Sequence, residues 1–289
     1  MLTYQAPAKV NLGLTVHGPR ADGYHDISTL FVKISLTDTL RFEATTRDIV
    51  IHCDHPDIPR DERNLIYRAA MALQPLAPGR GVLVHLQKAI PIAAGLGGGS
   101  SDAAATLLGL NRLWGLQLSQ AQLMQYAAGL GADVPFFVFP NVAALGRGRG
   151  DELEALVCPQ ALFLVLVKPP VAVSTAWVYG QLRFELTGTA KDTTILRQYL
   201  ESGNIAALGS ACSNDLEAIV VARFPEVQAV KRALGQPGLY GVGLSGSGPT
   251  VYALCPSRQI AQRVAGTVQH RGWETWVCHP WQGAATQPG

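Results

Sequence analysis

Charged residues are scarce in this chain of 289 residues: Asp, Glu, Lys and Arg together make up 15% of it, and the formal net charge is +2. A protein that binds nucleic acid through phosphate contacts needs a basic face or stripe. The only basic knot, Arg147 with Arg149, is too short to follow a phosphate backbone. We therefore expect no nucleic-acid partner. Hydrophobic residues make up 48% of the chain and indicate a well-cored globule of one large domain or two.

Cysteine and apolar runs are limited as well. The five cysteines are odd in number, scattered and never spaced Cys-x-x-Cys, which excludes a disulfide framework and favours reduced thiols. The ligand-like residues 52–55 have no second cluster to complete a zinc site, so a polar loop after a strand is the better interpretation. No run approaches the ~18 apolar residues of a membrane helix, and residues 1–5 do not resemble an export signal. We expect a cytoplasmic protein with no membrane partner.

The most informative segment runs from Pro91 to Leu110 and contains three consecutive glycines, two serines and an alanine-rich apolar stretch. Residues 82–87 alternate as a strand does, and the apolar residues of 103–110 recur at helical spacing. The expected order is strand, glycine loop, helix, with Ser100 or Ser101 as the N-cap. Glycines let backbone approach a phosphate, and a helix N-terminus attracts it. A plain turn before a capped helix is the alternative.

This loop differs from two well-known phosphate loops. Ser100, Ser101 and Asp102 follow its last glycine, where a Walker A motif has Lys. A dinucleotide fingerprint has spaced glycines after the first strand, whereas this cluster begins some ninety residues into the chain. Asp102 lies in the first helical turn, where its charge would repel a phosphate placed too close. We expect Asp102 to face away from a nucleotide or toward a metal ion.

Strand and helix patterns alternate along the chain and predict an α+β fold. Strands are expected at 9–16, 30–34, 162–167, 239–242, 250–255 and 274–278, and helices at 64–76, 119–130, 224–234 and 259–269. A glycine-rich, mobile connection is expected at 146–150. The second half predicts an antiparallel sheet covered by helices. We place a domain boundary near residue 155, so that residues 1–155 and 156–289 form two domains.

Three further segments carry chemical groups. Lys9 and Asn11 share one face of a strand, because alternate side chains point the same way. Asp133 lies between a glycine break and a proline. For each residue taken singly, a purely structural role stays an open alternative: Lys9 as an exposed lysine of a strand, and Asp133 as an aspartate of a turn. A second glycine cluster at 243–249 fits a hairpin turn, but its three glycines and two serines from 243 to 248 favour a second backbone wall for a phosphate site.

Four motifs together resemble the GHMP kinase superfamily. They are Pro-Ala-Lys-Val-Asn-Leu at 7–12, Pro-x-x-x-Gly-Leu-Gly-Gly-Gly-Ser-Ser at 91–101, Leu-Gly-Ala-Asp-Val-Pro at 130–135 and Gly-Ser-Gly-Pro at 246–249. The resemblance covers nearly the whole chain in the expected order. It implies the GHMP kinase fold, with an N-terminal ribosomal S5 domain 2-like domain for ATP binding and catalysis and a C-terminal ferredoxin-like domain for substrate. The segment Arg-Ala-Asp-Gly-Tyr-His at 20–25 is similar to the branch that phosphorylates the 2-hydroxyl of a cytidine diphosphate-linked methylerythritol in non-mevalonate isoprenoid synthesis.

The resemblance implies a role for each matching residue. Asp133 would be the general base, with Lys9 beside it, and ATP with Mg²⁺ would be the cofactors. The ATP-binding residues would be Pro91, Gly95, Leu96, Gly97, Gly98, Gly99, Ser100 and Ser101, with Lys88 and Asn64 on the adenosine side. The small-molecule substrate would be held by Asn11, Tyr24, His25, Thr175, Tyr179, Gly246 and Ser247. Tyr24 and Tyr179 would stack on cytosine, with Trp177 as the alternative to Tyr179, and His25 would bind the cytosine edge.

Other readings remain open at this stage. A homoserine or mevalonate kinase would share the phosphate motifs but should lack the Gly-Tyr-His turn at 23–25. A non-catalytic ligand sensor on the same fold is disfavoured by the presence of both Lys9 and Asp133. The metal ligand is undetermined: Asp102, Ser101 or water alone would serve. We expect a monomer or a weak homodimer.

Overall fold

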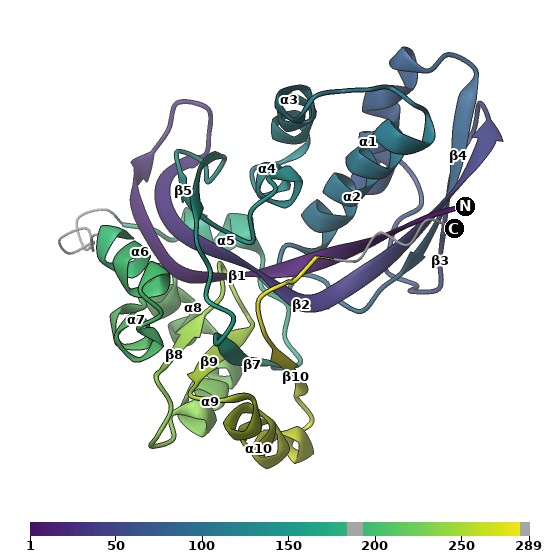
Figure 1. The fold of residues 1–289 in the computed structure, drawn as a ribbon. Helices are drawn as coiled ribbons and strands as arrows, with labels where there is room; N and C mark the ends of the chain where they lie inside the picture. Colours follow the sequence, from purple (N-terminus) through teal and green to yellow (C-terminus); the bar gives the residue numbers. More distant parts are fainter. Residues whose placement is uncertain (184–192, 284–289) are drawn as a thin grey trace.

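The computed structural model describes residues 1–183 and 193–283. Strands β1 (Leu2–Pro19), β2 (His25–Thr46), β3 (Ile49–Cys53), β4 (Arg80–Gln87), β5 (Ala143–Arg147) and β6 (Glu152–Leu156) form the first sheet. Its order is β3-β4-β2-β5-β6, with β1 also paired to β2. All pairs are antiparallel except β3 with β4. Figure 1 shows α1 (Leu65–Leu73), α2 (Gly98–Leu113), α3 (Gln120–Leu130) and α4 (Val134–Val138) gathered on one side of this sheet.

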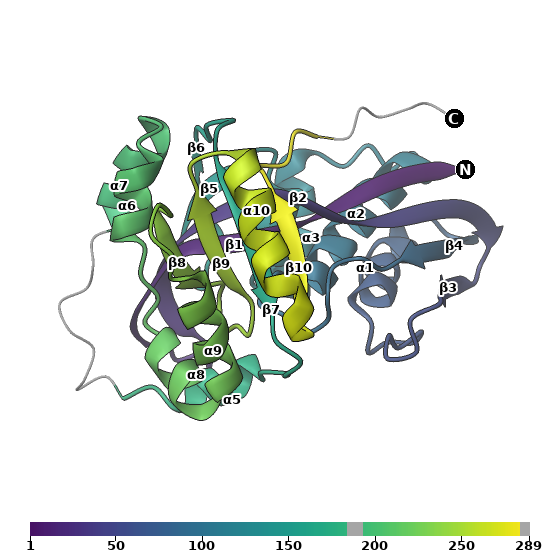
Figure 2. The same ribbon diagram turned by 90° about the horizontal axis from the view of Figure 1, so that it is seen from below.

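The second half forms a four-stranded antiparallel sheet in the order β10-β7-β9-β8. Its strands are β7 (Phe163–Lys168), β8 (Gly241–Leu244), β9 (Val251–Cys255) and β10 (Glu274–Cys278). Its helices are α5 (Thr175–Gly180), α6 (Thr193–Glu201), α7 (Ile205–Ala211), α8 (Glu217–Arg223), α9 (Pro225–Leu234) and α10 (Arg258–Val268), and short 3₁₀ turns follow α1 (Gln74–Leu76) and α10 (Gln269–Arg271). The α+β class is confirmed. Figure 2 shows α9 and α10 lying over one face of this sheet.

Strands β1 and β2 are much longer than the predicted segments 9–16 and 30–34. They pair from Leu2 with Phe42 to Pro19 with His25, with three register shifts. The continuous run of buried residues from Ala8 to Val16 explains the difference, because this part of β1 is covered on both faces and has little polar alternation. One core cluster joins Val10, Leu12 and Leu30 of the first sheet to Leu164 and Leu254 of the second. The central part of β1 therefore lies where the two sheets meet.

The helix starts predicted at 64, 119, 224 and 259 lie within one residue of the observed ones, whereas the start of α2 does not. Asn64 caps α1, and Ser119 caps α3 in a reciprocal capping box with Gln122. Helix α2 begins at Gly98 after Gly97, whose φ of 70° is left-handed, so the prediction of Ser100 or Ser101 as N-cap is wrong. No side chain caps the first N–H groups of α2. These donors remain open to a ligand.

The connection predicted at 146–150 is the turn of a hairpin. Gly146 and Arg147 belong to β5, and β6 follows after Gly148, Arg149, Gly150 and Asp151. Strand β6 ends at Leu156 and β7 begins at Phe163; the domain boundary near residue 155 stays a prediction. Within residues 1–183 and 193–283, no helix has the length and apolar character that crossing a membrane requires.

Candidate active site

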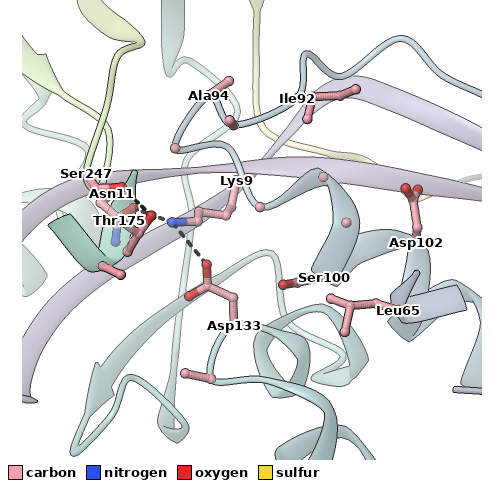
Figure 3. Close-up of a pocket in the computed structure, with 18 of the residues that line it drawn as sticks. Lys9, Asn11, Leu65, Ile92, Ala94, Ser100, Asp102, Asp133, Thr175 and Ser247 are labelled. Carbon is pink, nitrogen blue, oxygen red and sulfur yellow. Dashed lines mark hydrogen bonds and ion pairs between the residues drawn. The ribbon is translucent and has the colours of Figure 1, made fainter. Parts of the chain in front are cut away.

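A cavity of about 960 Å³ opens between the first sheet and the elements of the second half. Its walls come from β1, the start of β2, the glycine loop before α2, the segment before α4, helix α5 and the β8–β9 turn (Figure 3). Most of the predicted site residues line it: Lys9, Asn11, Tyr24, His25, Asn64, Lys88, Pro91, Gly95, Gly97, Gly98, Gly99, Ser100, Asp133, Thr175, Tyr179, Gly246 and Ser247. Residues more than two hundred positions apart in the sequence therefore share one cavity.

Two predicted residues of the glycine loop do not line the cavity. The side chain of Leu96 is buried in the core, and the Leu96 carbonyl accepts a hydrogen bond from the Lys9 N–H at 2.9 Å. Ser101 is buried in the first turn of α2. The side chains of Leu96 and Ser101 thus lie on the side of the loop that faces away from the cavity, and their predicted part in ATP binding stays a prediction.

Lys9, Asn11 and Asp133 form a contact in the middle of the cavity (Figure 3). Lys9 Nζ donates to Asn11 Oδ1 at 2.6 Å and lies 3.5 Å from Asp133 Oδ2. Asn11 Nδ2 donates in turn to Thr29 Oγ1 at 2.8 Å, which fixes the orientation of the amide. The Lys9 side chain is 5% exposed and that of Asp133 is 36% exposed. The carboxylate therefore faces the cavity, while the ammonium lies behind it.

The two glycine clusters contact each other through backbone. The 243–249 segment is both the turn between β8 and β9 and a wall of the cavity, since Gly246 and Ser247 line it. Ser245 Oγ donates to the Gly95 carbonyl at 3.0 Å and accepts from the Asn11 N–H at 3.3 Å. Gly95 has a φ of +74°, and a Cβ there would lie 2.2 Å from the Ser245 carbonyl oxygen. Only glycine fits this approach.

A buried ion cluster lies beneath the glycine loop. Lys88 Nζ contacts Asp38 and also lies 2.9 Å from Asp102 Oδ2. Burial raises the pKa of Asp102, although Lys88 opposes this shift. Burial alone would lower the pKa of Lys88, but the two carboxylates together raise it. Within the described residues, Asp102 Oδ1 and Ser101 Oγ are buried without a hydrogen-bond partner. Lys88 is thus held by carboxylates at the base of the loop.

Aromatic side chains gather at the other end of the cavity. The rings of His25 and Tyr179 are 5.0 Å apart, and Tyr24 is 45% exposed. Burial lowers the pKa of His25, and burial followed by the charge of Asp133 raises the pKa of Tyr179. Trp177 packs edge-on against Phe224 at 5.9 Å. Tyr179, and not Trp177, therefore lines the cavity.

Sequence reasoning missed one charged residue of this wall. The guanidinium of Arg149 lies 5.0 Å from the Tyr24 ring centroid and is ion-paired to Asp151 at 2.5 Å. The glycine-rich surroundings of Arg149 gave no local signal, since the β5–β6 hairpin brings it to Tyr24.

The ligand-like residues 52–55 were expected to form a polar loop after a strand. The first two of them, His52 and Cys53, are instead the last residues of strand β3. Within the described residues, no group of three or more His, Cys, Asp or Glu side chains could hold a metal ion.

Comparison with known proteins agrees with this geometry. Residues 64–141 match the family model of the GHMP kinases N-terminal domain, and residues 196–272 match that of the GHMP kinases C-terminal domain. The chain is 43% identical over 284 residues to a protein of Moorella thermoacetica, covering 96% of this chain and 98% of the relative. It is 43% identical over 274 residues to a protein of Geobacter sulfurreducens, covering 94% and 96%. Both relatives are named 4-diphosphocytidyl-2-C-methyl-D-erythritol kinase.

Solved structures give the same answer. A crystal structure of 4-(cytidine 5'-diphospho)-2C-methyl-D-erythritol kinase matches with a TM-score of 0.83 and 36% identity, covering 98% of this chain and 100% of that one. A homoserine kinase from Cytophaga hutchinsonii matches with a TM-score of 0.76 but 22% identity, covering 98% and 95%, which shows a shared fold alone. The chain therefore belongs to the GHMP kinases and, within them, to the family of the 4-diphosphocytidyl-2-C-methyl-D-erythritol kinases.

Proposed function

We propose that this protein transfers the γ-phosphoryl group of ATP to the 2-hydroxyl of 4-diphosphocytidyl-2-C-methyl-D-erythritol. The observation that carries the proposal is the position of the Lys9–Asp133 pair, between a glycine loop at a helix N-terminus and an aromatic end with Tyr24, His25 and Tyr179. A phosphate donor and a cytidine-bearing acceptor can thus meet at one carboxylate.

The glycine loop supports ATP binding. The open N–H groups of Gly98 and Gly99 at the start of α2 suit the phosphates, as does the positive end of the helix dipole. Asn64 and Lys88, at the same end of the cavity, would lie on the adenosine side. The site also fits Mg²⁺, because Asp102 lines the cavity and its Oδ1 is a buried oxygen without a partner in the described residues. When bound, Mg²⁺ would neutralise phosphate charge.

Asp133 is proposed as the general base. Its carboxylate accepts the proton of the substrate 2-hydroxyl as the oxygen attacks phosphorus, so the proton ends on the Asp133 side chain. The ammonium of Lys9, 3.5 Å away, stabilises the charge that develops on the attacking oxygen. Asn11 keeps the lysine directed at this point.

The aromatic end supports recognition of cytidine. Tyr24 and Tyr179 offer ring faces, and burial lowers the pKa of His25 and so favours its neutral form, in which one ring nitrogen donates and the other accepts. Thr175 and Ser247, whose hydroxyls are 2.7 Å apart, link α5 to the β8–β9 turn and leave polar groups near the acceptor. Homoserine and mevalonate, the acceptors of the alternative kinases, carry no base that could stack on two such aromatic faces.

The test is an assay for the product. The protein is incubated with ATP, Mg²⁺ and 4-diphosphocytidyl-2-C-methyl-D-erythritol, and ADP and the phosphorylated product are followed by mass spectrometry. We expect stoichiometric transfer by the wild type and a rate lower by ~10²-fold or more for Asp133→Asn, with substrate affinity retained. No product from the wild type would overturn the proposed reaction and favour a ligand sensor, whereas an unaffected Asp133→Asn variant would overturn only the role of Asp133.

A further inference from the structure

Lys33 is a buried lysine outside the proposed chemistry. It lies on β2 directly opposite Lys9 of β1, so both side chains leave the same face of the sheet. Its side chain is buried, and within the described residues no carboxylate lies within ion-pair distance of it. Burial lowers the pKa of Lys33 to about 7. A buried ammonium without a counter-ion destabilises a fold, so packing alone does not account for this residue.

Lys33 reaches the C-terminal end of α4. Its Nζ donates to the carbonyl of Phe139 at 2.5 Å and lies 3.5 Å from the carbonyl of Phe137. The last carbonyls of a helix have no partner within the helix, and lysine is suited to bind them. Asp133 lies at the opposite end of the same helix, as its N-cap residue. Two lysines that face each other across β1 and β2 thus contact the two ends of α4.

Aromatic rings complete this arrangement. Lys9 Nζ lies 5.3 Å from the ring centroid of Phe31, and Lys33 Nζ lies 5.1 Å from that of Phe136. The rings of Phe31 and Phe136 are themselves stacked, with centroids 4.8 Å apart. Phe136 therefore holds the side of α4 against the sheet, and the two lysines contact its two ends.

The short length of α4 makes these contacts important. A helix of five residues is far below the ~12 to 15 residues at which an isolated helix becomes even marginally stable. Its position is therefore set by tertiary contacts, and its N-cap carboxylate moves with it. The charged groups that face Lys33 across this helix are Lys9 from β1 and Asp133 from the far end of α4.

We propose that Lys33 is a positioning residue, which places the Asp133 carboxylate beside Lys9 by holding α4 from its C-terminal end. This inference rests on the proposed role of Asp133 as the base. Without Lys33, the C-terminal end of α4 loses one of its contacts, beside that of Gln120 Nε2, which donates to the Val138 carbonyl at 2.9 Å. A misplacement of ~1 Å at a reacting group costs up to ~10²-fold in rate. None of the predicted ATP- or cytidine-binding residues belongs to α4, so we expect a small shift of this helix to leave binding nearly unchanged.

The test compares Lys33→Met, which keeps an apolar stem without a donor, with Lys168→Met. Lys168 is the matched control, since it lies on β7 of the second sheet and pairs with Glu274. We expect kcat of Lys33→Met to fall ~10-fold or more, with KM for ATP and for the cytidylyl substrate nearly unchanged. Lys168→Met should match the wild type. Lys33→Gln, which retains a side-chain donor, is assayed alongside and should recover part of the rate; it replaces Lys33→Met if that variant does not fold.

Two readouts separate positioning from a general loss of stability. In the Asp133→Asn background, Lys33→Met should cause no further fall in rate, because the two residues act as one unit. The separation of Lys9 Nζ and Asp133 Oδ2, 3.5 Å in the wild type, should lengthen in a crystal structure of Lys33→Met without substrate, because α4 has lost this anchor. An equal loss of rate in both backgrounds, or an unchanged Lys9–Asp133 separation, would overturn the inference. A wild type inactive on the cytidylyl substrate would instead overturn the proposed function and leave the structural test valid.

Discussion

Gly95 and Gly99 belong to the same glycine run but have different surroundings. Gly95 has a left-handed φ of +74° and its position is closed by the Ser245 carbonyl, whereas a Cβ at Gly99 would meet nothing within 4 Å. Both residues line the cavity. One glycine is therefore required by the fold, and the other leaves open space in front of the backbone.

The two positions predict different effects, one on the stability of the protein and the other on ATP binding. Gly95→Ala should destabilise the protein by ~1 to 3 kcal/mol, because of backbone strain and the collision with backbone of the β8–β9 turn. Gly99→Val should leave unfolding nearly unchanged and weaken ATP binding, since its side chain points into the open cavity. Denaturant unfolding and calorimetry with ATP measure the two effects. A stable Gly95→Ala variant, or normal ATP affinity in Gly99→Val, would contradict this assignment.

Substitutions of the cavity aromatic residues should weaken binding of the cytidylyl substrate and leave ATP binding unchanged. Tyr24→Ala and Tyr179→Ala should each weaken binding of the cytidylyl substrate by ~1 to 3 kcal/mol if a stacking face is lost, by analogy with bases on single strands. KM for ATP should not change. Trp177→Phe is the control, because Trp177 packs on Phe224 away from the cavity. A rise in the ATP KM equal to that for the cytidylyl substrate would show general damage instead.

At this scale the sequence predicts contacts within one strand or loop. The shared face of Lys9 and Asn11 is confirmed by their 2.6 Å hydrogen bond. The sequence does not tell which loop residues turn inward, as Leu96 and Ser101 do. Nor does it predict Arg149, whose contact with Tyr24 depends on a hairpin and on a distant segment. The roles of the site residues stay predictions.

At the scale of elements, the segments with a strong hydrophobic period were predictable, and the strands buried on both faces were not. The strand 82–87 and the helices 119–130, 224–234 and 259–269 match β4, α3, α9 and α10 closely. The length of β1 was not predictable, because a strand buried on both faces has no polar alternation to follow. Helix α4 was missed because a helix of five residues, with Pro135 in its first turn, carries no periodic signal.

The anchoring of α4 gives a prediction for stability against pH. Because folding lowers the pKa of Lys33 from its ordinary 10.5 to about 7, the unfolded chain binds more protons than the native protein between these values. The stability of the wild type relative to Lys33→Met should therefore rise as the pH increases from 7 to 9, by up to about 1.4 kcal/mol per pH unit. Urea unfolding of both proteins at each pH measures the difference and cancels the other titrating groups. A difference that is constant or falls over this window would contradict a neutral native Lys33.

At the scale of the whole molecule, the site exists only because two sheets meet. Lys9 and Asn11 come from the first sheet, Ser247 from a turn of the second, and Thr175 from α5 (Figure 3). Gly246 belongs to the same turn and Tyr179 to the same helix. No local pattern places these segments together. Motif order and resemblance to the GHMP kinases carried that part of the prediction, and the long-range contact of Ser245 with Gly95 agrees with it.

The central claim is that one cavity joins an ATP-binding glycine loop to a cytidine-binding aromatic end across the Lys9–Asp133 pair. The most direct measurement is kcat/KM of the wild type, with ATP and Mg²⁺, on 4-diphosphocytidyl-2-C-methyl-D-erythritol and on the same methylerythritol phosphate without its cytidylyl group. Homoserine and mevalonate serve as further acceptors. We predict turnover of the cytidylyl substrate at least ~10²-fold above every other acceptor, because the others leave the aromatic end empty. Equal use of an acceptor without cytidine would contradict the account.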